Sequence, residues 1–427
     1  MPTRILAGLL LLGLFFTACK KDDPAPVPQT PDFTLFFNNE FNELQARYAV
    51  FLSDADGQMR AFRWLPGRDT ASLSVPGSAQ TDRFDCTIVK ITNIDASGSG
   101  VVDTTISLTT YTQLSDGQSI NLHDPEYRQS IDLLIQFTNI NSLDSIIVPD
   151  GLTFARPQPA NNFTGQYRIL HTGKVWLRIL INGESTWRYM FFDNVEGPNQ
   201  TASIDATILP KMFNAPSKYI GLPFNGPWSY LIEGLVDTSA NKFMPLGDLL
   251  RAPGGAVPVF EQLAVFEPEV RPYNGYRIRM SAPPGQAGYG YASDGFYTSL
   301  PSFLSAPNID ISASVPANSR YAAASCQGDI DAVSFTRSFT GLPGIRWEVL
   351  LPGSNGQIVT YRLPDLPDAI ADLSFALKTY NFGNAVEARA EAYANLSGFS
   401  LILQKRLQNN DPLWQAKGRF VARIRNF

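Results

Sequence analysis

The sequence predicts an all-β fold made of two or three β-sandwich (immunoglobulin-like) modules. Short segments rich in Val, Ile, Thr, Tyr and Phe alternate apolar and polar residues along most of the 427-residue chain, which is typical of strands with one buried face. The chain also has 32 Gly and 31 Pro, enough to supply turns between successive segments. No long segment places its apolar residues at helical spacing, and strands joined by short turns favour sandwiches.

We expect the first module to span residues 33–155. Its clearest element is a hairpin, because the turn from Asp54 to Gly57 joins two alternating segments and Gly accepts the positive φ of a tight turn. Asp54 and Asp56 could instead begin a calcium loop, but the position where such a loop needs a Glu holds Leu65. The strands expected in this module cover residues 47–53, 58–64, 84–93, 101–111, 131–138 and 144–148.

A second β-rich region is expected at residues 160–427. Pro157 and Pro159 indicate a linker before it, because proline interrupts regular structure. Whether this region divides again near residues 305–316 stays open. Its strands are expected at residues 166–170, 174–181, 185–192, 202–209, 261–266, 276–281, 346–351, 357–363, 374–380, 385–393, 399–404 and 414–424.

Two local features stand out within this second region. Asn182-Gly183 lies between two alternating segments and predicts a second hairpin. Residues 211–258 are rich in Gly and Pro, so we expect irregular structure there, with one short helix near residues 246–251.

The N-terminus has the pattern of a secretory signal peptide. Arg4 precedes an apolar run of 12 residues from Ile5 to Phe16, which a small residue, Ala18, closes. A helix needs roughly 20 apolar residues to cross a bilayer, so this run is too short to span one. We therefore expect residues 1–18 to be a signal peptide.

The next residues resemble those of lipoproteins. Phe16-Thr17-Ala18-Cys19 is similar to the lipobox of the lipoprotein signal peptidase, and Lys20-Lys21-Asp22-Asp23 resembles the export signal of Bacteroidota surface lipoproteins. The resemblance implies that Cys19 carries a diacylglycerol and an N-acyl chain such as palmitate. It also implies an outer-membrane, lipid-anchored protein exposed at the cell surface, since several acyl chains give lasting attachment.

The segment after Cys19 favours an extended tether. Residues 19–32 hold four prolines between Pro24 and Pro31, and proline-rich segments adopt the semi-rigid polyproline II conformation. We therefore expect folded structure to begin near Phe33.

The net charge and the cysteine content exclude several classes of protein. The net charge is −5, and loss of Arg4 with the signal makes it −5 − 1 = −6, so we expect no nucleic-acid partner. If Cys19 carries lipid, only Cys86 and Cys326 of the three cysteines remain. They allow at most one disulfide, and the sequence leaves open whether they are free.

No catalytic or metal-binding pattern is evident. The two histidines, His123 and His171, lie in no zinc or triad motif, and no G-x-S-x-G elbow is present. We therefore expect no catalytic residue, metal or cofactor. A hydrolase that uses two carboxylates far apart in sequence stays open as a less favoured alternative. The acidic residues considered for it are Glu233, Glu261, Asp294 and Glu348.

Four aromatic residues are the candidate ligand-binding positions. Tyr289, Tyr291 and Tyr297 alternate with Gly and Ser, as in binding loops where Tyr supplies contact area at little entropic cost. Trp228 follows Gly-Pro and could stack on a sugar ring. The alternatives are a Tyr-rich strand and a Trp packed on its own core.

These observations predict a non-enzymatic, membrane-anchored surface lipoprotein that binds an extracellular glycan or protein. An assembly component of an outer-membrane complex is the alternative, and a carboxylate-pair hydrolase is the third. A binding protein should present aromatic side chains with polar neighbours. An assembly protein should present a large apolar patch, and a hydrolase needs two acids about 5–10 Å apart.

Overall fold

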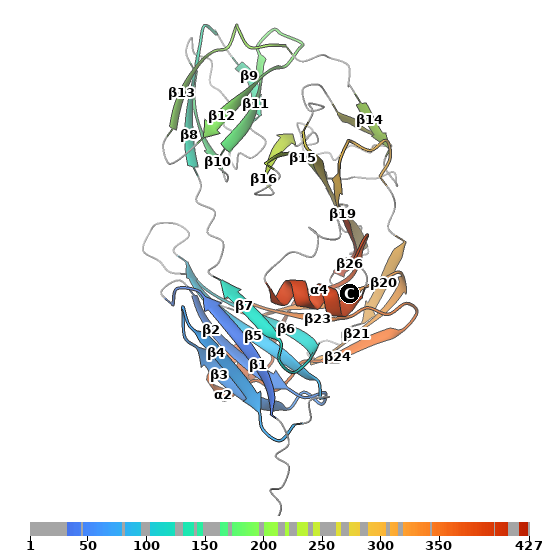
Figure 1. Ribbon diagram of the computed structural model, residues 1–427. Coiled ribbons are helices and arrows are strands. Elements are labelled where there is room, and N and C mark those ends of the chain that lie inside the picture. The colour runs from blue at the N-terminus through green and yellow to red at the C-terminus, as the bar shows by residue number, and fades with distance from the viewer. Residues whose placement is uncertain are drawn as a thin grey trace, which may run out of the picture.

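The computed structural model confirms an all-β fold (Figure 1). Three short helices accompany the strands in the part of the chain that the structure describes: α2 (Asp368–Ala371), α3 (Phe375–Lys378) and α4 (Phe399–Leu407). None of the helices among these residues is long and apolar enough to cross a membrane. The structure describes residues 32–43, 46–78, 82–94, 103–123, 131–140, 143–147, 163–169, 173–195, 200–211, 218–221, 229–237, 242–247, 262–265, 273–281, 289–304, 308–314, 319–341, 344–396, 398–408 and 418–425. The predicted signal peptide and nearly all of the tether lie outside this part.

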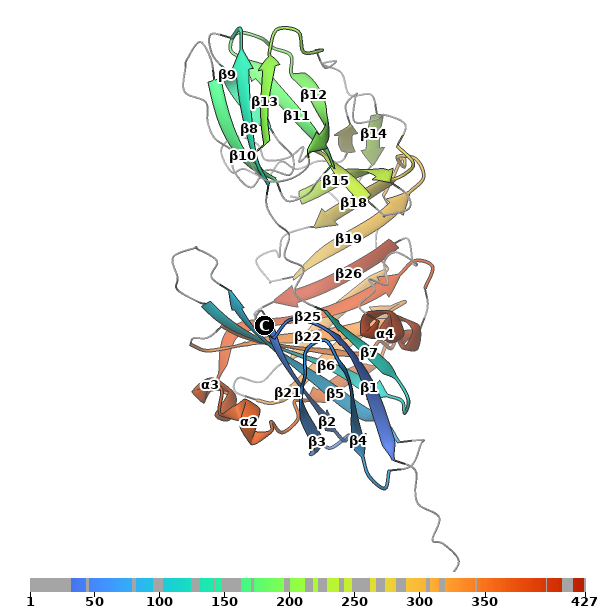
Figure 2. The same cartoon turned by 60° about the vertical axis from the view of Figure 1, so that its left-hand side comes forward.

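A 12-stranded sheet runs through the molecule, in the order β16-β15-β18-β19-β26-β25-β22-β23-β6-β5-β2-β3. Figure 2 shows it descending from β15 through β26 to β2 and β3. The parallel pair β23–β6 joins N-terminal to C-terminal strands, from Gly344 beside Thr105 to Leu350 beside Tyr111. The strands of this sheet are β2 (Ala46–Ser53), β3 (Met59–Leu65), β5 (Phe84–Ile94), β6 (Asp103–Leu114), β15 (Ser229–Asp237), β16 (Lys242–Gly247), β18 (Tyr276–Ser281), β19 (Tyr289–Tyr297), β22 (Ala332–Phe339), β23 (Gly344–Pro352), β25 (Phe382–Tyr393) and β26 (Gly418–Arg425).

Side chains of the lower part of this sheet are buried on both faces. Alternate residues of β2 point to opposite sides, so Phe51 enters one core while Val50 and Leu52 enter another. The first core lies under α2, α3 and the three-stranded sheet β20 (Ile309–Ser314), β21 (Tyr321–Gly328) and β24 (Ile358–Arg362). The second lies under α4 and the sheet β4 (Thr70–Val75), β1 (Phe33–Glu40) and β7 (Ser119–His123).

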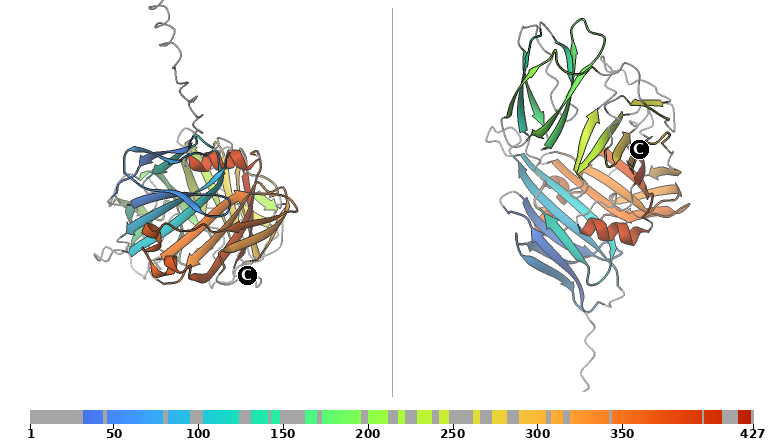
Figure 3. Two further views of the ribbon diagram at one scale, coloured as in Figure 1. Left: turned by 90° about the horizontal axis from the view of Figure 1, so that it is seen from below. Right: turned by 45° about the horizontal axis from the view of Figure 1, so that its top comes forward.

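This part of the molecule is therefore a three-layered body. The view from below shows α4 on one side of it and α2 with α3 on the other (Figure 3). The two free cysteines belong to different layers, since Cys86 is buried in the second core and Cys326 in the first. Burial raises the pKa of both thiols, that of Cys326 to about 11. The question that the sequence left open is answered: the two do not pair.

Two three-stranded sheets, β10-β8-β13 and β12-β11-β9, form a separate sandwich at the top of Figure 1. We call it the upper sandwich. Its strands pair across the boundary expected at residues 155–160, because β8 lies between β10 and β13. An alternating pattern identifies strands but does not specify their partners, so the sequence could not show this. The strands are β8 (Ile131–Thr138), β9 (Leu143–Ile147), β10 (Phe163–Ile169), β11 (Gly173–Ile181), β12 (Arg188–Val195) and β13 (Gln200–Asp205).

The two predicted hairpins are confirmed. β2 and β3 pair antiparallel around Gly57, which has a φ of 77°, and the Gly57 N–H donates to the Asp54 carbonyl at 2.9 Å. β11 and β12 pair in the same way around Gly183, with a φ of 85°. In both turns glycine occupies the left-handed region that other residues avoid.

Two predicted strands are helices in the structure. Residues 374–380 contain α3, because the Ser374 hydroxyl accepts the Ala376 N–H at 3.2 Å and so caps a helix start. Residues 399–404 lie in α4, where Leu403 and Leu407, four positions apart, enter the second core together. A window of six or seven residues is too short to separate the two periodicities.

Other elements were missed or displaced. A helix was expected near residues 246–251, but Leu246 and Gly247 belong to strand β16. Residues 248–251 lie outside the described residues. The open division near residues 305–316 falls on β20, whose Ile309 and Ile311 are buried in the first core. The strands without a predicted counterpart include β4, β7, β20, β21 and β22.

Candidate functional site

The strongest candidate site is an exposed pair of aromatic side chains, Tyr219 and Phe303. Tyr219 lies in β14 (Lys218–Gly221), which pairs antiparallel with β17 (Gln262–Val265). Phe303 lies in a segment that joins the other edge of β14. There the Gly221 N–H donates to the Ser302 carbonyl at 2.8 Å, and the Leu304 N–H donates to the Gly221 carbonyl at 2.9 Å.

Gly221 brings the two rings onto one face. A Cβ placed on Gly221 would lie 2.5 Å from Cδ2 of Phe303, so the phenyl ring occupies the space that a side chain would take. Tyr219 is two residues earlier in the same strand, and alternate residues share a face, roughly 6.6 Å apart along the backbone. Both side chains therefore lie on the same face of β14, although 303 − 219 = 84 residues separate them.

The backbone beneath the pair is fixed. Ile220, between the two positions, points the other way and is fully buried, and Leu300 and Leu304 are buried on either side of Phe303. The Lys218 ammonium group donates to the Leu300 carbonyl and ties the strand to this segment. Even so, Tyr219 is 54% exposed and Phe303 is 58% exposed, so anchored residues hold both rings in solvent.

Such a pair can bind a flat, partly apolar molecule. Each ring offers an apolar face, and Tyr219 adds a hydroxyl that can donate and accept hydrogen bonds. Exposed hydroxyls of Thr298, Ser299 and Ser302 lie in the segment that carries Phe303. The fixed backbone means that little conformational freedom is lost when a ligand binds.

The aromatic residues predicted from sequence lie elsewhere. Tyr291 is in β19, inside the large sheet, and packs against the first core. Tyr297 ends the same strand, and burial together with Asp294 raises the pKa of its hydroxyl. Tyr289 pairs with Ile424 at the start of β19, but its side chain is outside the described part, and so is all of Trp228. Their role in ligand binding stays a prediction.

The sequence carries one weak signal for the aromatic pair. Tyr219 lies in the region expected to be irregular, and Phe303 comes two residues after Pro301, so neither belongs to a long alternating segment. Gly221 is the residue that could have indicated the contact, since glycine within a strand often marks a close approach by another group. Its partner could not have been named without the fold.

Among the acidic residues considered for hydrolysis, two bind the same arginine. Arg277 donates to Asp294 at 2.9 and 2.6 Å, and its Nε lies 3.7 Å from Glu233. Arg279 also donates to Glu233, at 2.8 Å. The two carboxylates thus take part in an ion-pair network that connects β15, β18 and β19. Of the others, Glu348 lies 3.6 Å from an arginine of its own strand, and Glu261 is outside the described residues.

The remaining sequence candidates are placed as follows. His123 ends strand β7, and its Nδ1 lies 2.9 Å from the Glu40 carboxylate, while His171 is outside the described part. Cys19 is likewise outside it. Among the described residues, no three His, Cys, Asp or Glu side chains gather in a way that could hold a metal ion.

Comparisons with known proteins give no family. No family model and no curated protein matches the chain. Among solved structures, one match is the tip fimbrial protein Mfa3 from Porphyromonas gingivalis with C-terminal truncation, which is 10% identical. The match covers 39% of this chain and 83% of the fimbrial chain, with a TM-score of 0.17. A second match is Escherichia coli alpha-2-macroglobulin activated by porcine elastase, which is 11% identical. This match covers 86% of this chain and 41% of the macroglobulin chain, with a TM-score of 0.11. Scores this low support no inference about function.

Proposed function

We propose that this protein is a non-enzymatic, lipid-anchored cell-surface protein that binds an extracellular glycan on Tyr219 and Phe303. The observation that carries the binding function is the pair itself: two aromatic side chains, each more than half exposed, on the same face of a fixed backbone. The N-terminal resemblance to surface lipoproteins supports the location, because Cys19 would hold the chain to the membrane and β1 starts directly after the tether.

The size of the pair favours a small ligand over a protein. An aromatic side chain offers 150–250 Å² at most, so two half-exposed rings present about 200 Å². A stable protein interface needs about 800 Å² on each partner. A sugar ring matches the smaller area, since its C–H face is apolar and its edge carries hydroxyl groups that Ser299 and Ser302 could meet.

The position of the pair agrees with a binding role outside the membrane. β14 lies beside the upper sandwich, whereas β1, which follows the tether, lies in the three-layered body below (Figures 1 and 2). A protein held by Cys19 would therefore present β14 away from its anchored end.

Glycan binding is tested with the mature lipoprotein in detergent on an array of bacterial and host glycans. We expect one glycan class to bind, and Tyr219→Ala and Phe303→Ala each to weaken it. If about 80 Å² of apolar contact is lost in either variant, the cost is about 2 kcal/mol, or roughly 30-fold in affinity. Tyr321→Ala is the matched control, because Tyr321 is 57% exposed on a different sheet. No glycan binding, or an equal loss in the control, would refute the proposal.

The anchor is tested separately. Cys19→Ala should abolish incorporation of labelled palmitate and release the protein from the membrane fraction, whereas Cys86→Ala should leave both unchanged. Palmitate labelling that persists in the Cys19 variant would exclude this anchor without affecting the glycan proposal.

A further inference from the structure

The strand that follows the tether is paired on both of its edges. β1 is the central strand of the sheet β4-β1-β7, with six register pairs to β4 and five to β7. It lies in the three-layered body, at the other end of the molecule from β14 (Figure 2). Among the described residues, no third strand pairs with β1. A pull on the tether therefore reaches the rest of the protein through these two ladders and the core beneath them.

The relative direction of β1 and β7 determines how such a pull is resisted. The two strands are parallel, from Phe36 beside Ser119 to Glu40 beside His123, so their N-terminal ends lie at the same end of the ladder. The tether precedes the N-terminal end of β1, whereas the chain leaves β7 at its C-terminal end and continues to the upper sandwich. Opposite pulls on these two ends would slide the strands past each other, so all bonds of the ladder carry the load together.

Side chains add links between the two strands. The Thr34 N–H donates to Oδ1 of Asp116 at 2.7 Å, just before β7 begins. Farther along, Nδ2 of Asn38 donates to Oδ1 of Asn121 at 2.8 Å. The ladder is thus reinforced near its start and near its middle, on the same two strands that a pull would slide apart.

One face of the ladder is closed to water. Phe33, Leu35 and Phe37 of β1 are fully buried in the second core, together with Ile120 and Leu122 of β7. Water can therefore replace the ladder bonds only from the other face. A hydrogen bond at the edge of an apolar core is also electrostatically stronger than one surrounded by water.

We propose that β1 and β7 have a second, mechanical function: they form a clamp that keeps the protein folded while a bound ligand pulls against its anchor. This inference rests on the proposed function, because the lipid at Cys19 and a glycan held on β14 supply the two opposing pulls. Forced unfolding is governed by the rate of unfolding and not by equilibrium stability. A clamp therefore makes resistance depend on where the force is applied, which a merely stabilising sheet would not do.

The test is force spectroscopy on single molecules of the mature chain without its lipid. One handle is coupled to the thiol of Cys19, because the other two cysteines are buried. The second handle is coupled to an azide-bearing amino acid at position 123, at the far end of β7, or at position 119, at its near end. From position 123 the ladder bonds share the load, whereas from position 119 they break one after another. The first rupture should therefore need about twice the force from position 123.

A double variant removes the two side-chain links and keeps the backbone ladder. Asn38→Ala combined with Asp116→Ala should lower the rupture force measured from position 123 by about a quarter, since two of roughly eight links between the strands are lost. Both substitutions act on the clamp itself, between the two handles.

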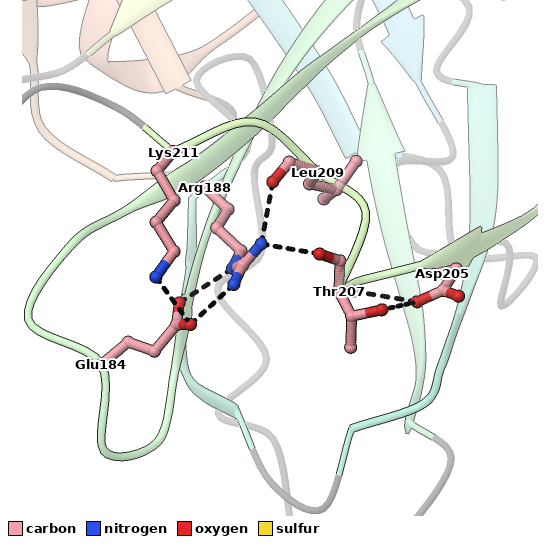
Figure 4. A network of polar contacts seen from close by, with 6 residues as sticks. All are labelled: Glu184, Arg188, Asp205, Thr207, Leu209 and Lys211. Carbon is pink, nitrogen blue, oxygen red and sulfur yellow. Dashed lines mark hydrogen bonds and ion pairs between the residues drawn. The ribbon is translucent and has the colours of Figure 1, made fainter.

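Arg188→Lys is the matched control, because it disturbs a polar network outside the stretched segment. Arg188 donates to the Thr207 and Leu209 carbonyls at 2.8 and 2.9 Å and to both oxygens of Glu184 (Figure 4). Lys keeps the charge but cannot form these bonds together. The network lies in the upper sandwich, so Arg188→Lys should leave the rupture force unchanged.

Equal forces from positions 119 and 123, or a larger force from position 119, would overturn the proposal. A double variant as resistant as the native chain would also overturn it, as would an Arg188→Lys variant as weak as the double variant. The measurement needs neither lipid nor glycan. Its failure is therefore distinguishable from a failure of the anchor or of glycan binding.

Discussion

Asp85 in β5 should make the stability of the three-layered body depend on pH. Its carboxylate accepts the Gln113 N–H at 3.0 Å and a hydrogen bond from the Tyr361 hydroxyl. Burial nevertheless raises its pKa from 3.8 to about 6, and the nearby charge of Asp54 adds to the increase. The folded protein therefore favours the protonated form of Asp85 more than the unfolded chain does.

The direction and size of the effect follow from this difference. Below pH 3.8 both states hold the proton and the stabilisation is fully present; it is lost as the pH rises through 6. A difference of about 2.2 pKa units, at about 1.36 kcal/mol per unit, makes the loss roughly 3 kcal/mol.

Asp85→Asn removes this titration while keeping the shape of the side chain. The free energy of unfolding of the variant minus that of the native protein should become more positive by about 2.4 kcal/mol between pH 4 and pH 7. Urea unfolding followed by tryptophan fluorescence at several pH values measures it. Asp329→Asn, at an exposed position, should parallel the native protein. A difference that stays constant, or falls, as the pH rises would refute the reasoning.

Two further predictions concern buried groups. Burial alone would raise the pKa of Glu391, but Arg406 on α4, 2.9 Å away, helps to hold it below its usual value. Glu391→Gln leaves that arginine without its buried counter-charge and should lower the free energy of unfolding by about 3–5 kcal/mol in urea titrations. Lys378→Ala, which removes an exposed ion pair, should cause no such loss. Equal losses in the two variants would contradict this reasoning. Cys86 and Cys326 are buried with raised pKa values, so a thiol reagent should modify them only after denaturation, and rapid labelling of the folded protein would show the burial to be wrong.

Local chemistry explains which elements the sequence predicts well. The hairpins at Gly57 and Gly183 depend on four or five adjacent residues, so the turn alone identifies them. The alternating segments of β2 and β11 were equally recognisable. In contrast, α4 is nine residues long and its register depends on Leu403 and Leu407 reaching a core made by strands far away in the chain.

Contacts between distant segments explain what the sequence could not predict. Nothing near β6 indicates that it pairs with β23, and nothing near Tyr219 indicates that Phe303 shares its face. The sequence made Tyr291 a binding candidate because of its Gly- and Ser-rich surroundings and left a Tyr-rich strand as the alternative; those surroundings do belong to a strand inside the sheet. Composition around an aromatic residue does not determine its exposure; the layer that covers it does.

The parallel pair β23–β6 also constrains the order in which the protein can fold. Strand β6 is synthesised more than two hundred residues before β23, and the first core contains side chains from both. The N-terminal strands emerge with one face of their sheet uncovered until the C-terminal third of the chain arrives. Long-range pairing of this kind makes folding slow and leaves intermediates prone to aggregation. A nascent chain of this protein should therefore depend on chaperones for longer than one built of modules that each close on their own strands.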